Sequence, residues 1–158
     1  MTAAAAAAAA AALLVVPGAG SAPLSRTAGL GGAAAGATLR LDSAAVPAGL
    51  AASALAAQER ANRHTAQRML GHYGWGTRQF TPLNKLWTRE SGWNKYASNP
   101  YSGAYGIPQA VPGGKMASAG PYWRTNATTQ IRWGLRYIKS RYGSPARAWA
   151  HELAYGWY

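Results

Sequence analysis

The pattern of hydrophobic and polar residues predicts four helices in the last two thirds of the chain. The first covers residues 51–70, and Gly71 is a typical stop signal after it. In the second, Thr81 is a suitable N-cap, Pro82 fits the first helical position and Gly92 ends the helix. This pattern indicates a mainly α-helical domain.

A third helix has the clearest signals. Asn126 is a good N-cap, Gly143 a good stop, and the apolar residues between them follow the helical period. The apolar stripe consists of Ile131, Gly134, Leu135, Ile138 and Tyr142. Ser144-Pro145 then opens a fourth helix, which continues through residues 146–154.

Residues 96–122 separate the second and third helices. They contain five Gly and four Pro residues, with Tyr and Ser between them. Such a composition is typical of loops and turns, and it leaves room for one short hairpin.

The N-terminal third shows no helical or strand period. Residues 1–22 combine an apolar run with small residues, which favours a secretory signal peptide. No Lys or Arg precedes the run, so a misplaced start codon or an Ala-rich disordered tail stays open. Residues 23–52 have the composition of a flexible, disordered Ala/Gly-rich linker, which leaves 53–158 as the folded domain.

Positive charge is concentrated in the predicted domain. The chain has a net charge of +12, while residues 1–59 carry two basic and two acidic side chains. From residue 60 onward, 14 Lys and Arg residues accompany only Glu90 and Glu152. A field of this sign favours anionic partners such as cell-wall polymers, nucleic acid or anionic lipid. Cysteine is absent, which excludes thiol chemistry and disulfides.

Glu90 is the most informative of the few acidic residues. It shares a helix face with Leu83, Leu86 and Trp87, at positions i, i+3, i+4 and i+7. A carboxyl group beside apolar side chains loses hydration, which raises its pKa and suits it to general acid catalysis. The alternative is a carboxylate that caps a loop or pairs with an arginine.

Two motifs stand out in this region. Glu90 and Ser91 form a Glu-Ser pair at the end of a predicted helix, and Gly103, Gly106, Ile107 and Gln109 form a Gly-x-x-Gly-Ile-x-Gln motif in the loop that follows. With these motifs the chain resembles the soluble lytic transglycosylases, which share their fold with goose-type lysozymes and whose second motif has Leu in place of Ile107. The resemblance covers roughly residues 60–158.

The resemblance implies cleavage of the β-1,4 bond between N-acetylmuramic acid and N-acetylglucosamine in peptidoglycan. Glu90 would be the single acid and base, and the product would be a 1,6-anhydro sugar. Substrate would contact Ser91, Tyr105 and the loop residues Gly103, Gly106, Ile107 and Gln109. Ordinary glycoside hydrolysis uses two carboxylates, and Glu152, otherwise a surface residue, keeps that alternative open.

The chain departs from the family at a third motif. The usual Ala-Tyr-Asn, whose Tyr orients the acid, is replaced by the sequence AWAHELAYGWY. Trp149, His151 or Tyr155 are the candidates to take over this role.

Other side chains allow two interpretations each. Five aromatic residues would either stack on sugar rings or fill the core: Trp93, Tyr101, Tyr105, Trp123 and Trp133. Arg132, Arg136 and Lys139 form either a solvated helix face or an electrostatic contact with wall polymers. The three histidines lack metal-binding spacing, so neither a metal nor another cofactor is expected.

Two other classes of protein compete with an enzyme. A non-catalytic cell-wall binding module would keep the fold and make Glu90 dispensable. Nucleic-acid binding fits basic charge interleaved with aromatic residues, but no motif of that class is present. We expect a secreted, cell-wall-associated monomer that binds peptidoglycan strands and anionic wall polymers, without nucleic acid or a membrane span.

Overall fold

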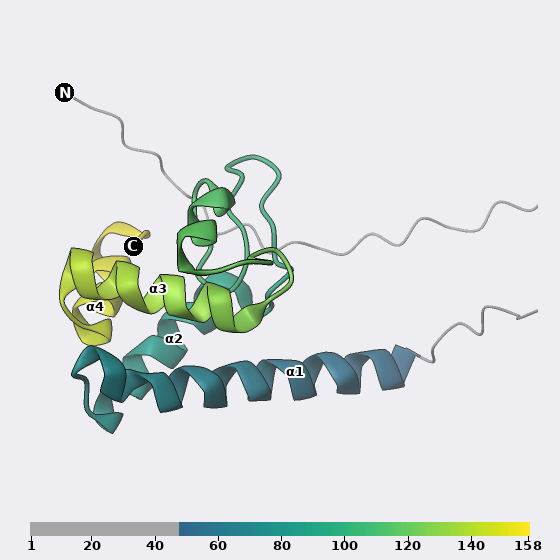
Figure 1. Ribbon diagram of the computed structural model, residues 1–158, viewed down its shortest axis with the longest axis horizontal. Coiled ribbons are helices and arrows are strands. Elements are labelled where there is room, and N and C mark those ends of the chain that lie inside the picture. Colours follow the sequence, from purple (N-terminus) through teal and green to yellow (C-terminus); the bar gives the residue numbers. More distant parts are fainter. Residues whose placement is uncertain (1–47) are drawn as a thin grey trace, which may run out of the picture.

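The computed structural model describes residues 48–158, which form four α-helices and three short 3-10 helices (Figure 1). The α-helices are α1 (Ala48–Met69), α2 (Phe80–Ser91), α3 (Ala127–Tyr142) and α4 (Pro145–Tyr155). The 3-10 helices are η1 (Leu70–Tyr73), η2 (Thr77–Gln79) and η3 (Gly113–Ala119). The mainly α-helical fold class is confirmed.

The predicted signal peptide and most of the predicted linker lie outside the described residues. Within them, α1 begins at Ala48, so residues 48–52 are helical and the expected linker boundary differs by five residues. The first half of α1 extends past the other helices (Figure 1). Its only buried residues, Asn62 and Ala66, lie in the second half, where Asn62 Nδ2 donates to the carbonyl of Trp93 at 3.0 Å.

The core lies where α2, α3 and α4 meet the end of α1. Trp87 and Trp93 are both fully buried and meet edge to face, with ring centroids 5.1 Å apart. Leu83 and Leu86 on α2 and the predicted stripe on α3 complete it, with Ile131, Leu135 and Ile138 fully buried. Trp93 is therefore a core residue, and the sugar-stacking alternative for it is wrong.

The ends of α3 and α4 follow the sequence signals, whereas the end of α1 and the start of α2 do not. Gly71 does not stop the first helix, because it lies inside η1, which ends at the left-handed Gly74. Pro82 is the third residue of α2 and not the first. Asn126 Oδ1 accepts from the amides of Thr128 and Thr129, and Ser144 caps α4 ahead of Pro145. Thr81 is not an N-cap, because η2 runs directly into α2, which begins at Phe80. The N-terminus of α2 is instead connected to α4 by Gln79, whose Oε1 accepts a hydrogen bond from the amide of Ala146 at 3.0 Å.

The loop between α2 and α3 contains little regular structure. The expected hairpin is reduced to two isolated antiparallel bridges, Ser98–Tyr105 and Tyr105–Ala110, and no strand forms in residues 48–158. The 3-10 helix η3, which the Gly- and Pro-rich composition did not predict, packs on α3, and its Met116 is fully buried.

The side chain of Gln130 on α3 holds the loop between α2 and α3 in place. Its fully buried side chain accepts from the amide of Ile107 at 3.0 Å and donates to the carbonyls of Lys95 (3.0 Å) and Trp123 (2.8 Å). A Cβ added to Gly106 would lie 2.5 Å from Gln130 Oε1, so only glycine allows this approach. The side-chain amide of Gln130 thus makes hydrogen bonds to the loop backbone in place of those that the paired strands of a hairpin would have made.

Replacing Gln130 by Leu should destabilise the protein by about 3 kcal/mol or more, because three buried backbone groups lose their partner. The free energy of unfolding, measured by urea denaturation, tests this. Gln67→Leu, on the exposed side of α1, is the matched control and should change it by less than about 0.5 kcal/mol. Equal effects of the two substitutions would contradict the anchoring role of Gln130.

Candidate active site

Glu90 lies in the last turn of α2, largely withdrawn from solvent. Burial raises the pKa of its carboxyl from 4.5 to about 7, and the negative charge of Glu152 contributes in the same direction. The neighbouring guanidinium of Arg89 opposes both effects and lowers the pKa. Near neutral pH, a large fraction of Glu90 therefore carries a proton that it can donate.

The second carboxylate, Glu152 of α4, is buried, which corrects the expectation of a surface residue. It is 3% exposed, and its Oε1 lies 2.9 Å from Arg89 Nε. Its Oε2 is also buried and accepts no hydrogen bond from the described residues. Burial raises the pKa of Glu152, while Arg89 and His151 lower it. The pair joins α2 to α4 immediately beside Glu90.

Tyr158 is the aromatic residue most closely coupled to Glu90. Its hydroxyl accepts from Trp87 Nε1 at 2.8 Å and donates to the carbonyl of Pro108 at 2.9 Å. Burial and the charge of Glu90 raise the pKa of Tyr158 well above 10. Sequence reasoning missed this residue, because only its position in the fold brings the end of the chain against α2.

The three residues expected to replace the third motif, Trp149, His151 and Tyr155, lie against the core or among other aromatic residues. His151 Nδ1 lies 2.8 Å from the carbonyl oxygen of Trp157, and its ring packs 4.5 Å from that of Tyr155. Tyr155 is largely exposed, and Trp149 is half-buried against the core. His151 and Tyr155 therefore belong to an aromatic cluster at the C-terminal end of α4.

Ser91 connects the end of α2 to the loop. Its hydroxyl donates to the carbonyl of Ile107 at 2.8 Å and accepts from the amide of Trp93 at 3.1 Å. Ile107 is fully buried, so it packs in the core and the substrate contact expected for its side chain is wrong. Ser91 thus holds the loop in place next to Glu90.

The remaining loop candidates are held mainly by the loop's own backbone. Gln109 Nε2 donates to the carbonyls of Gly106 (2.9 Å) and Ala97 (3.2 Å). Tyr105 donates its hydroxyl proton to the carbonyl of Arg124 at 3.0 Å, and Gly103 is exposed at a turn with φ 71°. These contacts give the loop a defined shape beside the acid.

A small cavity of about 190 Å³ opens beside Tyr158, between the loop and α3. Its lining includes Pro108, Gln109, Lys115, Trp133 and Tyr137. Residues of the loop and of α3 thus meet at this cavity next to Tyr158, and Glu90 itself does not line it.

Comparison with protein-family models, curated protein sequences and solved structures found no match to this chain. Within residues 48–158, no three His, Asp or Glu side chains are placed to hold a metal ion together. None of the helices in that part of the chain combines the length and hydropathy required to cross a bilayer.

Glu90→Gln should increase stability at pH 8 by roughly 3 kcal/mol, since a Glu whose pKa rises from 4.5 to about 7 on folding costs about 1.4 kcal/mol per pH unit to ionise. The sign follows from the raised pKa: the wild-type protein loses stability as the pH rises from 4.5 to 7. The gain in the variant should therefore shrink toward zero near pH 4.

Urea denaturation at several pH values measures this difference. Glu59→Gln is the control, because Glu59 forms a partly exposed i,i+4 pair with Arg63 on α1, at 3.8 Å. A gain for Glu90→Gln that is the same at pH 4 and pH 8 would contradict the raised pKa of Glu90.

Proposed function

We propose that this protein is a lytic transglycosylase with a lysozyme-like fold that cleaves peptidoglycan. The observation that carries the proposal is the partly buried Glu90 carboxyl at the end of α2, where loss of hydration raises its pKa to about 7. It stands beside the loop that bears the second family motif, and Ser91 and Gln130 fix that loop. A general acid is most effective when its pKa lies near the working pH.

In the proposed reaction, Glu90 donates its proton to the glycosidic oxygen as the bond from that oxygen to C1 of the muramoyl residue breaks. The carboxylate then accepts the proton of the muramoyl C6 hydroxyl, whose oxygen forms a new bond to C1. Glu90 ends protonated, as it began. No water is consumed, and the products are a 1,6-anhydro-muramoyl end and a free N-acetylglucosamine hydroxyl.

The environment of Glu152 supports a single-carboxylate reaction over hydrolysis. A hydrolase would need its second carboxylate free to activate water or to attack the sugar. Glu152 is 3% exposed, and one of its oxygens is bound to Arg89. We assign it instead the role of a fixed charge that helps to keep Glu90 protonated.

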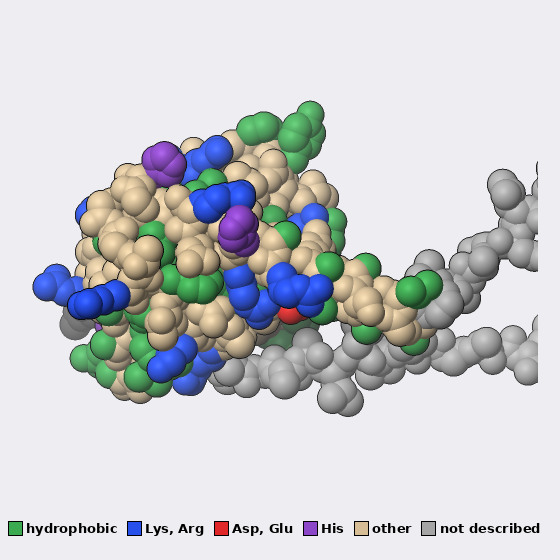
Figure 2. All heavy atoms as spheres, turned by 90° about the horizontal axis from the view of Figure 1, so that it is seen from below, with side chains coloured by type: hydrophobic (Ala, Val, Ile, Leu, Met, Phe, Trp, Pro, Cys, Tyr) green, Lys and Arg blue, Asp and Glu red, His purple; other side chains and the backbone are tan. Residues whose placement is uncertain are grey.

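The surface charge supports an anionic substrate. The described residues contain 14 Lys and Arg side chains, and only Glu59, Glu90 and Glu152 oppose them. Figure 2 shows Lys and Arg scattered over one face, with almost no Asp or Glu visible there. This field would concentrate the protein on peptidoglycan and its attached polyanions outside the cell, in accord with the proposed export.

Digestion of purified sacculi, with products separated by mass spectrometry, tests the function. The wild-type protein should release anhydro-muropeptides, and Glu90→Gln should reduce their release at least about 1,000-fold, since it removes the group that donates and accepts the proton. Glu59→Gln should retain full activity. Products with reducing ends would identify a hydrolase, and sedimentation with the wall without cleavage would indicate a binding module.

The rate should also depend on pH in a way set by the neighbours of Glu90. We expect kcat/KM to fall above about pH 7, where Glu90 loses its proton. Glu152→Gln removes a negative charge and leaves Arg89 unpaired, and both changes lower the pKa of Glu90. The falling limb of the pH profile should therefore move to lower pH, whereas an unchanged limb would contradict this coupling.

A further inference from the structure

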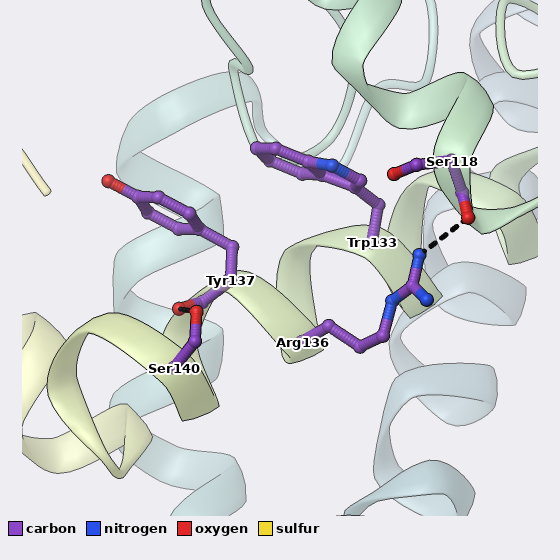
Figure 3. A pocket seen from close by; sticks show the side chains of 5 residues that line it. All are labelled: Ser118, Trp133, Arg136, Tyr137 and Ser140. Atoms are coloured by element: carbon purple, nitrogen blue, oxygen red, sulfur yellow. Dashed lines mark hydrogen bonds between the residues drawn. The ribbon is translucent and has the colours of Figure 1, made fainter.

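A second, larger hollow of about 340 Å³ lies on the outer face of α3 (Figure 3). It is lined by Ser118, Trp133, Arg136, Tyr137 and Ser140. Its volume falls in the range of about 300–1,000 Å³ that is usual for ligand pockets. Neither family motif contributes to this hollow.

Two aromatic rings form its floor. Trp133 and Tyr137, one helical turn apart on α3, have nearly parallel ring planes at 7°, with centroids separated by 5.3 Å. Both side chains are only half-buried, and they lie side by side along the helix (Figure 3). The two rings are stacked on one another with an offset, and a flat ligand face can stack on the part of a ring face that stays exposed.

An arginine with spare hydrogen-bonding capacity borders this floor. Arg136 Nη2 donates to the carbonyl of Ser118 at 2.8 Å, which aims the guanidinium along the edge of the hollow (Figure 3). No other acceptor and no carboxylate among residues 48–158 binds this group. An arginine has five N–H donors, so most of them stay free for a ligand.

The aromatic floor continues toward the proposed catalytic residue. Trp133 and Tyr137 also line the smaller cavity beside Tyr158. The rings of Tyr137 and Tyr158 meet edge to face, with centroids 6.0 Å apart. The charge of Glu90 also acts on Tyr158, so aromatic contacts connect the hollow to a neighbour of the proposed catalytic residue.

We infer that this hollow is a subsite for a muramoyl peptide, in which Trp133 and Tyr137 stack on a pyranose ring and Arg136 binds a carboxylate of the attached stem peptide. The inference rests on the proposed function, and it adds recognition of the peptide's charge. Arginine pairs with carboxylates through two parallel hydrogen bonds, so a free carboxylate is distinguished from its amide. The subsite would thus favour peptidoglycan whose stem carboxylates are not amidated.

Binding to the full chain carrying Glu90→Gln, which cannot turn over its ligand, tests the subsite. The probes are peptidoglycan fragments of equal length with free or amidated stem carboxylates, and a neutral chitooligosaccharide, measured by calorimetry. The free acid should bind about tenfold more tightly than the amide, as expected for one charge-assisted bidentate contact. Adding Arg136→Gln should reduce this preference to less than about twofold.

Arg132→Gln is a closely matched control. Arg132 lies one turn earlier on α3 and donates to the carbonyl of Ala119 at 2.9 Å, so this variant also loses one charge and one bond to η3. Arg132 does not line the hollow, and its variant should keep the tenfold preference. Trp133→Ala should weaken both fragments and the chitooligosaccharide by a similar factor.

Three results would overturn the inference: no preference for the free acid, equal loss in the Arg136 and Arg132 variants, or tighter Arg136-dependent binding of a single-stranded oligonucleotide. The proposed function is tested separately, by digestion of sacculi with the wild-type protein. If the protein cleaves sacculi but shows no preference for free stem carboxylates, only the subsite is contradicted. If it shows the preference but does not cleave, the catalytic function is contradicted and a binding site is left.

Discussion

The buried amide of Gln130 is the interaction on which the rest of the structure depends. The 35-residue connection between α2 and α3 (residues 92–126) has two isolated bridges and a 3-10 helix in place of a sheet. Gln130 binds three backbone groups of this connection from inside the core, and Gly106 allows the close approach. Because buried polar groups are costly to leave unpaired, this arrangement specifies one loop conformation.

The chemistry of the site follows from holding that loop against the end of α2. Ser91 binds the carbonyl of Ile107, and Tyr158 binds that of Pro108, so hydrogen bonds tie the loop to the end of α2 and to Tyr158 beside Glu90. The resulting loss of hydration raises the pKa of Glu90 to about 7. The ion pair of Arg89 with Glu152 then places one charge of each sign nearby.

Local features of the fold and the acid itself were predictable from sequence, whereas the partners of the acid were not. Asn126 and Ser144 cap helices through hydrogen bonds to residues two or three positions away, so their roles can be predicted from the local sequence. The apolar neighbours of Glu90 on the helix period likewise predicted its burial. Glu152 and Tyr158 lie more than 60 positions away, and only tertiary packing makes them neighbours of α2.

NMR titration of the side-chain carboxyl carbons would show directly whether Glu90 holds its proton near neutral pH. The chain contains only three Glu residues, so selective 13C labelling gives three signals, and Glu90→Gln identifies one of them. We predict that the Glu90 signal titrates near pH 7. A Glu90 signal that titrates near pH 4.5 would contradict the role of Glu90 as a general acid, because the group would then be an ordinary ionised carboxylate.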